Sequence, residues 1–171
     1  MNRTEQAGSN PDRGALLEHV NAARAELLAS IDGLSEAEMT TQIVSGVWTV
    51  RDILAHISGW AVWDLTTIRS ILAGQQPDLT AIQKVDAFND RLVEERRDWT
   101  VKEILAEMQA AQAALQELLA DLSDETLFDS ALFQGPYWDN LAEWLRVFWE
   151  HEEEHAVEIR TWRAARGDVN G

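Results

Sequence analysis

Apolar residues recur every three or four positions in four long stretches of the chain, which is the pattern of amphipathic α-helices. These stretches span residues 11–33, 49–74, 100–122 and 139–167. Shorter amphipathic segments are expected after Ser35, at about residues 81–97 and after Ser123. No segment sustains an alternation of apolar and polar residues, so no strand is expected. The pattern therefore predicts an all-α protein, a four-helix bundle with short extra helical segments.

The residues at the ends of these segments support the predicted boundaries. Three starts carry a capping box, in which Ser or Thr caps the helix and an acidic residue follows three positions later: Ser35 with Glu38, Thr49 with Asp52, and Thr100 with Glu103. Asp139 is expected to cap the last long helix. Glycines are expected to end three of the long helices, at Gly33, Gly74 and Gly167.

Composition and charge narrow the classes of function. The 171 residues suffice for one domain, expected over residues 11–167 between a disordered N-terminus at residues 1–10 and a tail at residues 168–171. Thirty acidic and 14 basic residues give a net charge of −16, which disfavours binding to nucleic acid or to an acidic membrane. The absence of cysteine excludes disulfides, thiolate metal ligands and cysteine nucleophiles. No apolar run resembles a signal peptide or a membrane span, so a cytoplasmic location is expected.

Three of the four histidines form a candidate metal site. His151 and His155 lie one helical turn apart, and a helical wheel directs both towards the interior of the bundle. His56 is the natural third ligand, although it lies on the flank of its helix's apolar stripe and not at the centre. His19 is expected to be exposed. Neutral imidazoles are good ligands for zinc or nickel, and facing helices of a bundle are a usual place for such a site.

The sequence HEEEH at residues 151–155 also matches H-E-x-x-H, a zinc-protease motif. One class of these proteases needs Gly and a further His at positions that here hold Glu158 and Thr161. Another class needs a third ligand on a separate downstream helix, for which too few residues follow His155. No strand is expected that would bind a peptide substrate. We therefore interpret the match as a coincidence within a glutamate-rich helix.

Two carboxylates are candidate catalytic residues. Glu152 is expected to orient a ligand imidazole or to act as a general base through metal-bound water, and a partly buried glutamate without a role is an equal alternative. Asp64 lies inside the apolar stripe of its helix, where burial raises the pKa of a carboxyl group, and is a secondary candidate. Glu107 is expected to face solvent.

Aromatic residues near the predicted ligands are candidates for binding a substrate. Trp60 and Trp63 follow His56 on the same predicted helix, while Tyr137 and Trp138 follow Gly135-Pro136 in a predicted loop. Aromatic residues at helical spacing more often form the core, and this alternative stays open for the tryptophans.

Two stretches, WTVRDILAHISGW from Trp48 and HEEEHAVEIRTW from His151, carry a resemblance to the DinB/YfiT-like superfamily. The resemblance extends from about Gly14 to Arg166. It implies an up-down-up-down four-helix bundle, often a homodimer, that holds zinc or nickel through one histidine on the second long helix and two on the last. The ligands so implied are His56, His151 and His155, and three histidines leave one coordination position open.

The resemblance also implies a range of functions. Relatives include transferases and isomerases that use a low-molecular-weight thiol, so the leading hypothesis is a metal-dependent enzyme that acts on a small molecule by thiol transfer or by hydrolysis. A second branch resembles the colibactin self-protection proteins, to which VDAFNDRLVEE from Val85 and the SGW after His56 are similar. The alternatives are thus a metal-independent self-protection protein that hydrolyses or sequesters a toxic metabolite, and a non-catalytic dimer that binds a small ligand.

Overall fold

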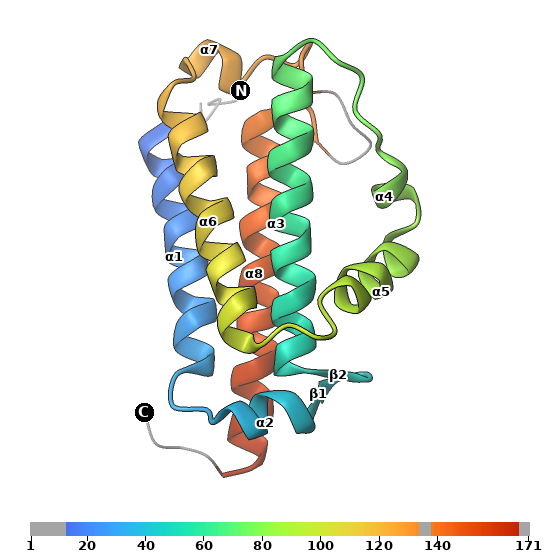
Figure 1. Cartoon of the computed structure of the whole chain (residues 1–171). Helices are drawn as coiled ribbons and strands as arrows, with labels where there is room; N and C mark the ends of the chain where they lie inside the picture. The colour runs from blue at the N-terminus through green and yellow to red at the C-terminus, as the bar shows by residue number, and fades with distance from the viewer. Residues whose placement is uncertain (1–12, 134–137, 168–171) are drawn as a thin grey trace, which may run out of the picture.

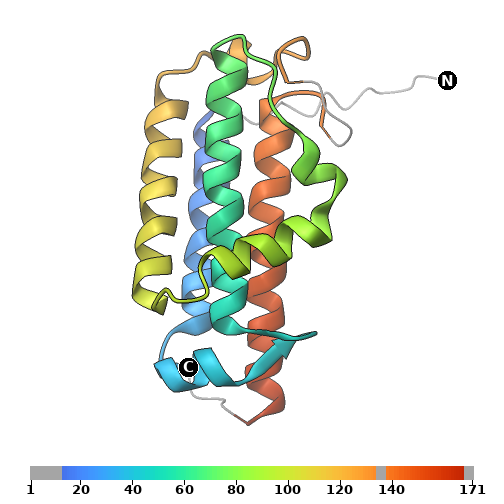
Figure 2. The same cartoon turned by 45° about the vertical axis from the view of Figure 1, so that its right-hand side comes forward.

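The computed structural model of the protein describes residues 13–133 and 138–167. Four long helices lie side by side: α1 (Arg13–Ile31), α3 (Val50–Leu72), α6 (Val101–Ala120) and α8 (Leu141–Ala165) (Figures 1 and 2). The predicted all-α four-helix bundle is therefore confirmed. The terminal segments predicted at residues 1–10 and 168–171 lie outside the described residues.

Short elements connect the long helices. They are α2 (Glu36–Thr41), β1 (Ile43–Ser45), β2 (Trp48–Thr49), α4 (Thr80–Gln83), α5 (Val85–Glu95) and α7 (Asp124–Leu127). The segment predicted at residues 81–97 is thus two helices and not one. The antiparallel β1–β2 hairpin was not expected, because strands of three and two residues are too short to show an alternation.

Local capping explains where most of the helices begin and end. All three predicted capping boxes form, at the starts of α2, α3 and α6. The glycines expected to end helices have positive φ angles, the conformation that glycine adopts most readily: Gly33 (75°), Gly74 (72°) and Gly167 (76°). The prediction for Asp139 is wrong, because the Asn140 side chain accepts the cap hydrogen bond from the Glu143 amide. Asp139 lies one residue outside the cap, and its own amide donates to the Glu143 carboxylate at 2.8 Å.

The helix directions differ from the up-down-up-down order that the family resemblance implied. The long connection through α4 and α5 returns the chain along the outside of the bundle, so that α6 runs parallel to α3 (Figure 1). Side-chain contacts agree with this direction: Arg51, at the start of α3, donates to the Trp99 carbonyl just before α6 at 3.1 Å. Arg13, at the start of α1, donates to the Ala120 carbonyl at the end of α6, also at 3.1 Å. The bundle is therefore down-up-up-down.

A close approach between α3 and α5 depends on Gly59. A Cβ atom at this position would lie 2.6 Å from a methyl group of Leu92, so any larger residue would push α5 away. Nearby, Arg96 donates to the Glu107 carboxylate at 2.6 Å, and Ser58 also donates to it. The expectation that Glu107 faces solvent is wrong, because this acid joins α3, α6 and the end of α5.

The hydrophobic core fills the bundle along its length in two clusters of buried residues. Within it, α1 packs closely along α8 and α3 along α6, whereas α3 and α8 make few close backbone approaches. This wider spacing leaves room for large side chains between α3 and α8. No helix in the described part of the chain has the length and apolar character needed to cross a bilayer.

Candidate metal centre

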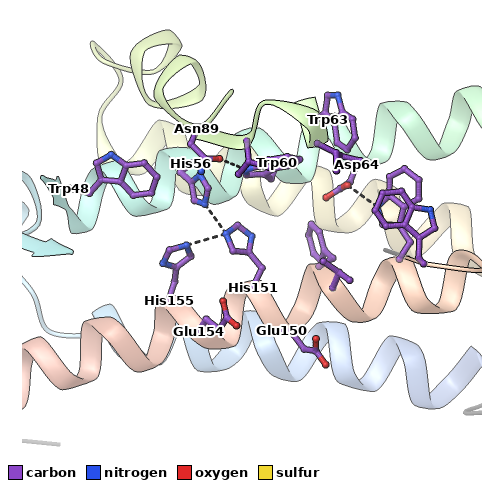
Figure 3. A pocket seen from close by; sticks show the side chains of 16 residues that line it. Trp48, His56, Trp60, Trp63, Asp64, Asn89, Glu150, His151, Glu154 and His155 are labelled. Atoms are coloured by element: carbon purple, nitrogen blue, oxygen red, sulfur yellow. Dashed lines mark hydrogen bonds between the residues drawn. The ribbon is translucent and has the colours of Figure 1, made fainter. Parts of the chain in front are cut away.

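A cavity of about 440 Å³ lies between α3, α5 and α8 (Figure 3). Its wall contains three histidines, a group of aromatic and apolar side chains, and three carboxylates. Of the candidate site residues, the following line it: His56, His151, His155, Asp64, Trp60, Trp63 and Trp138. Tyr137 lies outside the described residues, and Glu152 is not part of the wall.

The three histidines meet at one end of the cavity. His56 extends from α3 towards His151 and His155, which project from adjacent turns of α8 (Figure 3). The Nε2 atoms of His56 and His151 are 2.7 Å apart, and those of His151 and His155 are 3.1 Å apart. One ligand atom from each of the three residues lies within 4.8 Å of the others. Side chains 95 residues apart in sequence therefore share one small volume.

Burial keeps two of these imidazoles neutral. Removal from water, together with smaller effects of the neighbouring His151 and His155, lowers the pKa of His56 to about 2, against a small opposite effect of Asn89. Burial, and then His155, lowers the pKa of His151 to about 3. Neutral imidazole is the form that coordinates a metal ion.

Side chains around the histidines fix their orientation. His155 donates from Nδ1 to the Glu158 carboxylate at 2.7 Å, because a carboxylate only accepts, and in a neutral ring this hydrogen bond directs the Nε2 lone pair towards the centre. Ser45 on β1 donates to the same carboxylate at 3.1 Å. The Trp48 ring on β2 lies 4.8 Å from the His56 ring. The unexpected hairpin thus contributes directly to the site.

The donor set fits a divalent metal ion. Nε2 of His151 contacts the Nε2 atoms of both His56 and His155. In a neutral ring this nitrogen either donates one hydrogen bond or accepts one, so hydrogen bonds between the three neutral rings can satisfy only one of the two contacts. A metal ion at the centre would accept all three lone pairs. Zn–N bonds of about 2.0–2.1 Å in tetrahedral geometry need nitrogens about 3.3 Å apart, only a few tenths of an ångström more than the closest separations here.

Glu152 lies on the other side of α8 from the histidines. It forms a two-point ion pair with Arg24 of α1, with separations of 2.8 and 2.5 Å, and their exposed fractions are 1% and 5%. Arg24 also donates to the Met108 carbonyl at 3.0 Å, which links α1, α6 and α8. Sequence reasoning missed this arginine, although it falls four residues after Val20 within the apolar stripe of its helix. The structure therefore places Glu152 in a buried structural ion pair.

Asp64 lies at the opposite end of the cavity from the histidines (Figure 3). Its Oδ1 atom accepts a hydrogen bond from the Trp144 indole at 2.8 Å. Burial raises the pKa of the Asp64 carboxyl group to about 7, against a smaller lowering effect of this hydrogen bond. Asp64 is eight residues beyond His56, which at about 1.5 Å per residue is roughly 12 Å along α3.

The remaining histidine is apart from the site. His19 is exposed on α1, as expected, and its ring stacks on Trp149 at 5.2 Å. Residues that sequence reasoning did not assign to the site include Asn89, whose amide oxygen accepts from the Trp60 indole at 2.8 Å, and Glu158. Glu158 follows His155 by three residues, a spacing that puts both on one helix face and was a usable signal.

Solved structures with the same fold have little sequence identity to this chain. An uncharacterised protein from Escherichia coli UTI89 has a TM-score of 0.81 at 14% identity, over 92% of this chain and 96% of its own. The sibling lethal factor precursor DfsB has a TM-score of 0.81 at 17% identity, over 92% and 98%. The colibactin self-resistance protein ClbS, solved in complex with double-stranded DNA, has a TM-score of 0.75 at 11% identity, over 91% and 97%. At these identities the similarity establishes the fold alone.

Sequence comparison identifies the family. No curated protein matches the chain significantly. The sequence pattern of the DinB superfamily, however, matches residues 19–159, which include all three clustered histidines. The chain therefore belongs to the DinB superfamily.

Proposed function

We propose that this protein binds one divalent metal ion, zinc or nickel, through His56, His151 and His155, and acts on a small molecule in the adjoining cavity. The observation that supports this most is the convergence of three imidazole Nε2 atoms from two helices. A cavity of about 440 Å³ suits a small molecule, since ligand sites usually measure about 300–1,000 Å³.

The side chains of this site have distinct tasks in the proposal. Three imidazoles would hold the ion from one side and leave a coordination position towards the cavity. When bound, the ion supplies Lewis acidity that lowers the pKa of a water molecule or a thiol. Glu158 holds the ring of His155, while Trp48 packs on His56 and shields it from water. The reaction would be thiol transfer or hydrolysis, with the thiol supplied by a low-molecular-weight cofactor because the chain has no cysteine.

Glu152 is not retained as a catalytic residue in this proposal. Its carboxylate is fully engaged by Arg24 and points away from the cavity. For Asp64, the separation of roughly 12 Å along α3 from His56 favours contact with a distal part of the ligand over contact with the reacting atoms.

Calorimetric titration of metal-free protein with zinc and with nickel tests the metal site. Wild-type protein is expected to bind one ion per chain, and His155→Ala is expected to weaken binding by at least about 100-fold. His19→Ala is the matched control, because it removes an exposed imidazole outside the cavity. Equal affinity in wild type and His155→Ala would contradict the proposal.

The similarity to ClbS supports a second candidate function, metal-independent self-protection against a toxic metabolite. Here the cavity would bind or hydrolyse the metabolite through its aromatic and acidic wall. Protection of sensitive cells that survives His151→Ala would favour this candidate, and protection lost with that variant would favour the metal-dependent one.

We further propose that this chain does not bind DNA, although ClbS was solved with it. A net charge of −16 opposes contact with phosphates. Fluorescence anisotropy with a labelled duplex at low salt is expected to show no binding, and saturable binding would contradict this.

A homodimer, which the family resemblance implies, is tested by sedimentation equilibrium.

A further inference from the structure

The charge on the cavity wall has one sign. The charged side chains that line it are Asp64, Glu150 and Glu154, and no lysine or arginine belongs to the described wall. Arg146 pairs with Glu150 at 2.8 Å, so the charge of Glu150 is compensated. At the end of the cavity away from the histidines, a ligand therefore meets the Asp64 carboxylate without a basic side chain in the described wall.

Asp64 is the innermost of these carboxylates and lacks a charge partner. The Asp64 side chain is partly buried and lines the cavity. Its Oδ1 accepts from Trp144, while Oδ2 has no hydrogen-bond or ion-pair partner among the described residues. An ionised carboxylate in such a place is unfavourable unless a cation or donors compensate it. Beyond the Trp144 N–H, the described residues supply no cation or donor for this carboxylate.

Indole rings surround this end of the cavity. Trp144, which donates to Asp64, is 4.3 Å from Trp138 and 6.1 Å from Trp63 between ring centroids. Trp63 is in turn 5.3 Å from Trp60. These four tryptophans with Asp64 are called the aromatic end. Aromatic faces attract a cation, and the attraction is strongest for tryptophan and for a site away from bulk water.

We propose that the aromatic end binds the organic cation of a substrate, a quaternary or substituted ammonium group, with Asp64 as its counter-ion. This inference deepens the proposed function and rests on it for the claim that the ligand is a substrate. The reacting group of the ligand would lie at the three histidines, roughly 12 Å from the ammonium group along α3. Asp64 is then a binding residue, and the aromatic end selects against anionic groups.

The test is calorimetry on the metal-free full-length chain at about pH 8.5, where Asp64 is ionised. The probes are benzyltrimethylammonium and its neutral isostere 2,2-dimethylpropylbenzene, which differ in charge but hardly in shape. The ammonium is expected to bind at least about tenfold more tightly than the isostere. Asp64→Asn, which keeps the acceptor for Trp144, is expected to reduce that preference to the part that the tryptophans alone provide. Asp90→Asn removes the same charge from an exposed position on α5, and this variant is expected to retain the preference for the ammonium.

A second variant keeps the inference testable if Asp64→Asn does not fold. Trp63→Leu keeps an apolar side chain but removes an aromatic face. This variant is expected to weaken binding of the ammonium more than binding of the isostere. Equal binding of both probes to wild type, an unchanged preference in Asp64→Asn, or no ammonium binding up to about 10 mM would overturn the inference. Because no metal is present, the result is separate from that of the zinc titration: loss of the metal site with a retained ammonium preference would contradict the proposed function alone.

Discussion

The pKa of Asp64 leads to a specific prediction about stability. Asp64→Asn replaces a buried group that must ionise near neutral pH with an uncharged group of nearly the same shape, whose Oδ1 can still accept from Trp144. The folded protein holds the Asp64 proton more tightly than the unfolded chain does, because the folded pKa is raised from 3.8 to about 7. The contribution of Asp64 to the unfolding free energy is therefore fully present below about pH 4 and is lost as the pH rises through 7.

The size of the effect follows from the same values. A rise of about three in pKa at about 1.4 kcal/mol each gives about 4 kcal/mol, an upper limit because the Asp64 side chain is only partly buried. Wild type should therefore lose up to about 4 kcal/mol of unfolding free energy between pH 4 and pH 8 through Asp64. Asp64→Asn should be close to wild type at pH 4 and more stable by up to that amount at pH 8.

Urea unfolding followed by circular dichroism, at several pH values between 4 and 8, measures this difference. Asp90→Asn on the exposed side of α5 serves as the control and should match wild type at each pH. A gain in stability that is the same at pH 4 and pH 8 would show that the pKa of Asp64 is not raised, since a packing effect of the substitution would not depend on pH. A loss at pH 8 would show that Asp64 has a stabilising partner when ionised.

Three further substitutions test the positions of individual side chains. Glu152→Gln, which leaves Arg24 without its charge partner, should lower the unfolding free energy in urea by about 3 kcal/mol and keep the metal. Glu158→Ala should weaken metal affinity by about 10- to 100-fold in competition with a chelator, because the ring of His155 loses its hydrogen-bond acceptor. Asn140→Ala should lower the unfolding free energy by about 1 kcal/mol, because α8 loses its cap.

Matched variants control each of these experiments. Glu153→Ala removes an exposed acid from the same helix as Glu158 and should leave metal affinity unchanged. Asp139→Ala should lower the unfolding free energy clearly less than Asn140→Ala does, and the reverse order would contradict the assignment of Asn140 as the cap. If Glu152→Gln abolished metal binding in a folded protein, Glu152 would have to act on the site and not only on Arg24.

The parts of the fold that depend on local sequence were predictable. The capping boxes at Ser35, Thr49 and Thr100 act within four residues, so the sequence specified where these helices begin. The β1–β2 hairpin was not predictable from periodicity because its strands are too short. The direction of α6 was not predictable either, because it depends on how α4 and α5 cross the outside of α3.

The site was predictable in its residue types but not in its surroundings. A wheel placed His56 on the flank of its helix, yet its exposed fraction is 3%, because Trp48 and the α8 histidines cover that flank. Glu152 and Arg24 are 128 residues apart, and neither position alone indicates which partner the other helix supplies. Pairings of this kind depend on which helices become neighbours, which local patterns do not encode.

The metal content of His56→Ala shows whether the three histidines act as one metal site, because His56 is the ligand that α3 must bring to the other two. Elemental analysis should be made on protein purified without a metal-affinity tag, with wild type and His19→Ala alongside. We expect about one zinc or nickel ion per chain in wild type and His19→Ala, and almost none in folded His56→Ala. An ion retained in full by His56→Ala, or a folded wild-type protein without affinity for either metal, would contradict the account.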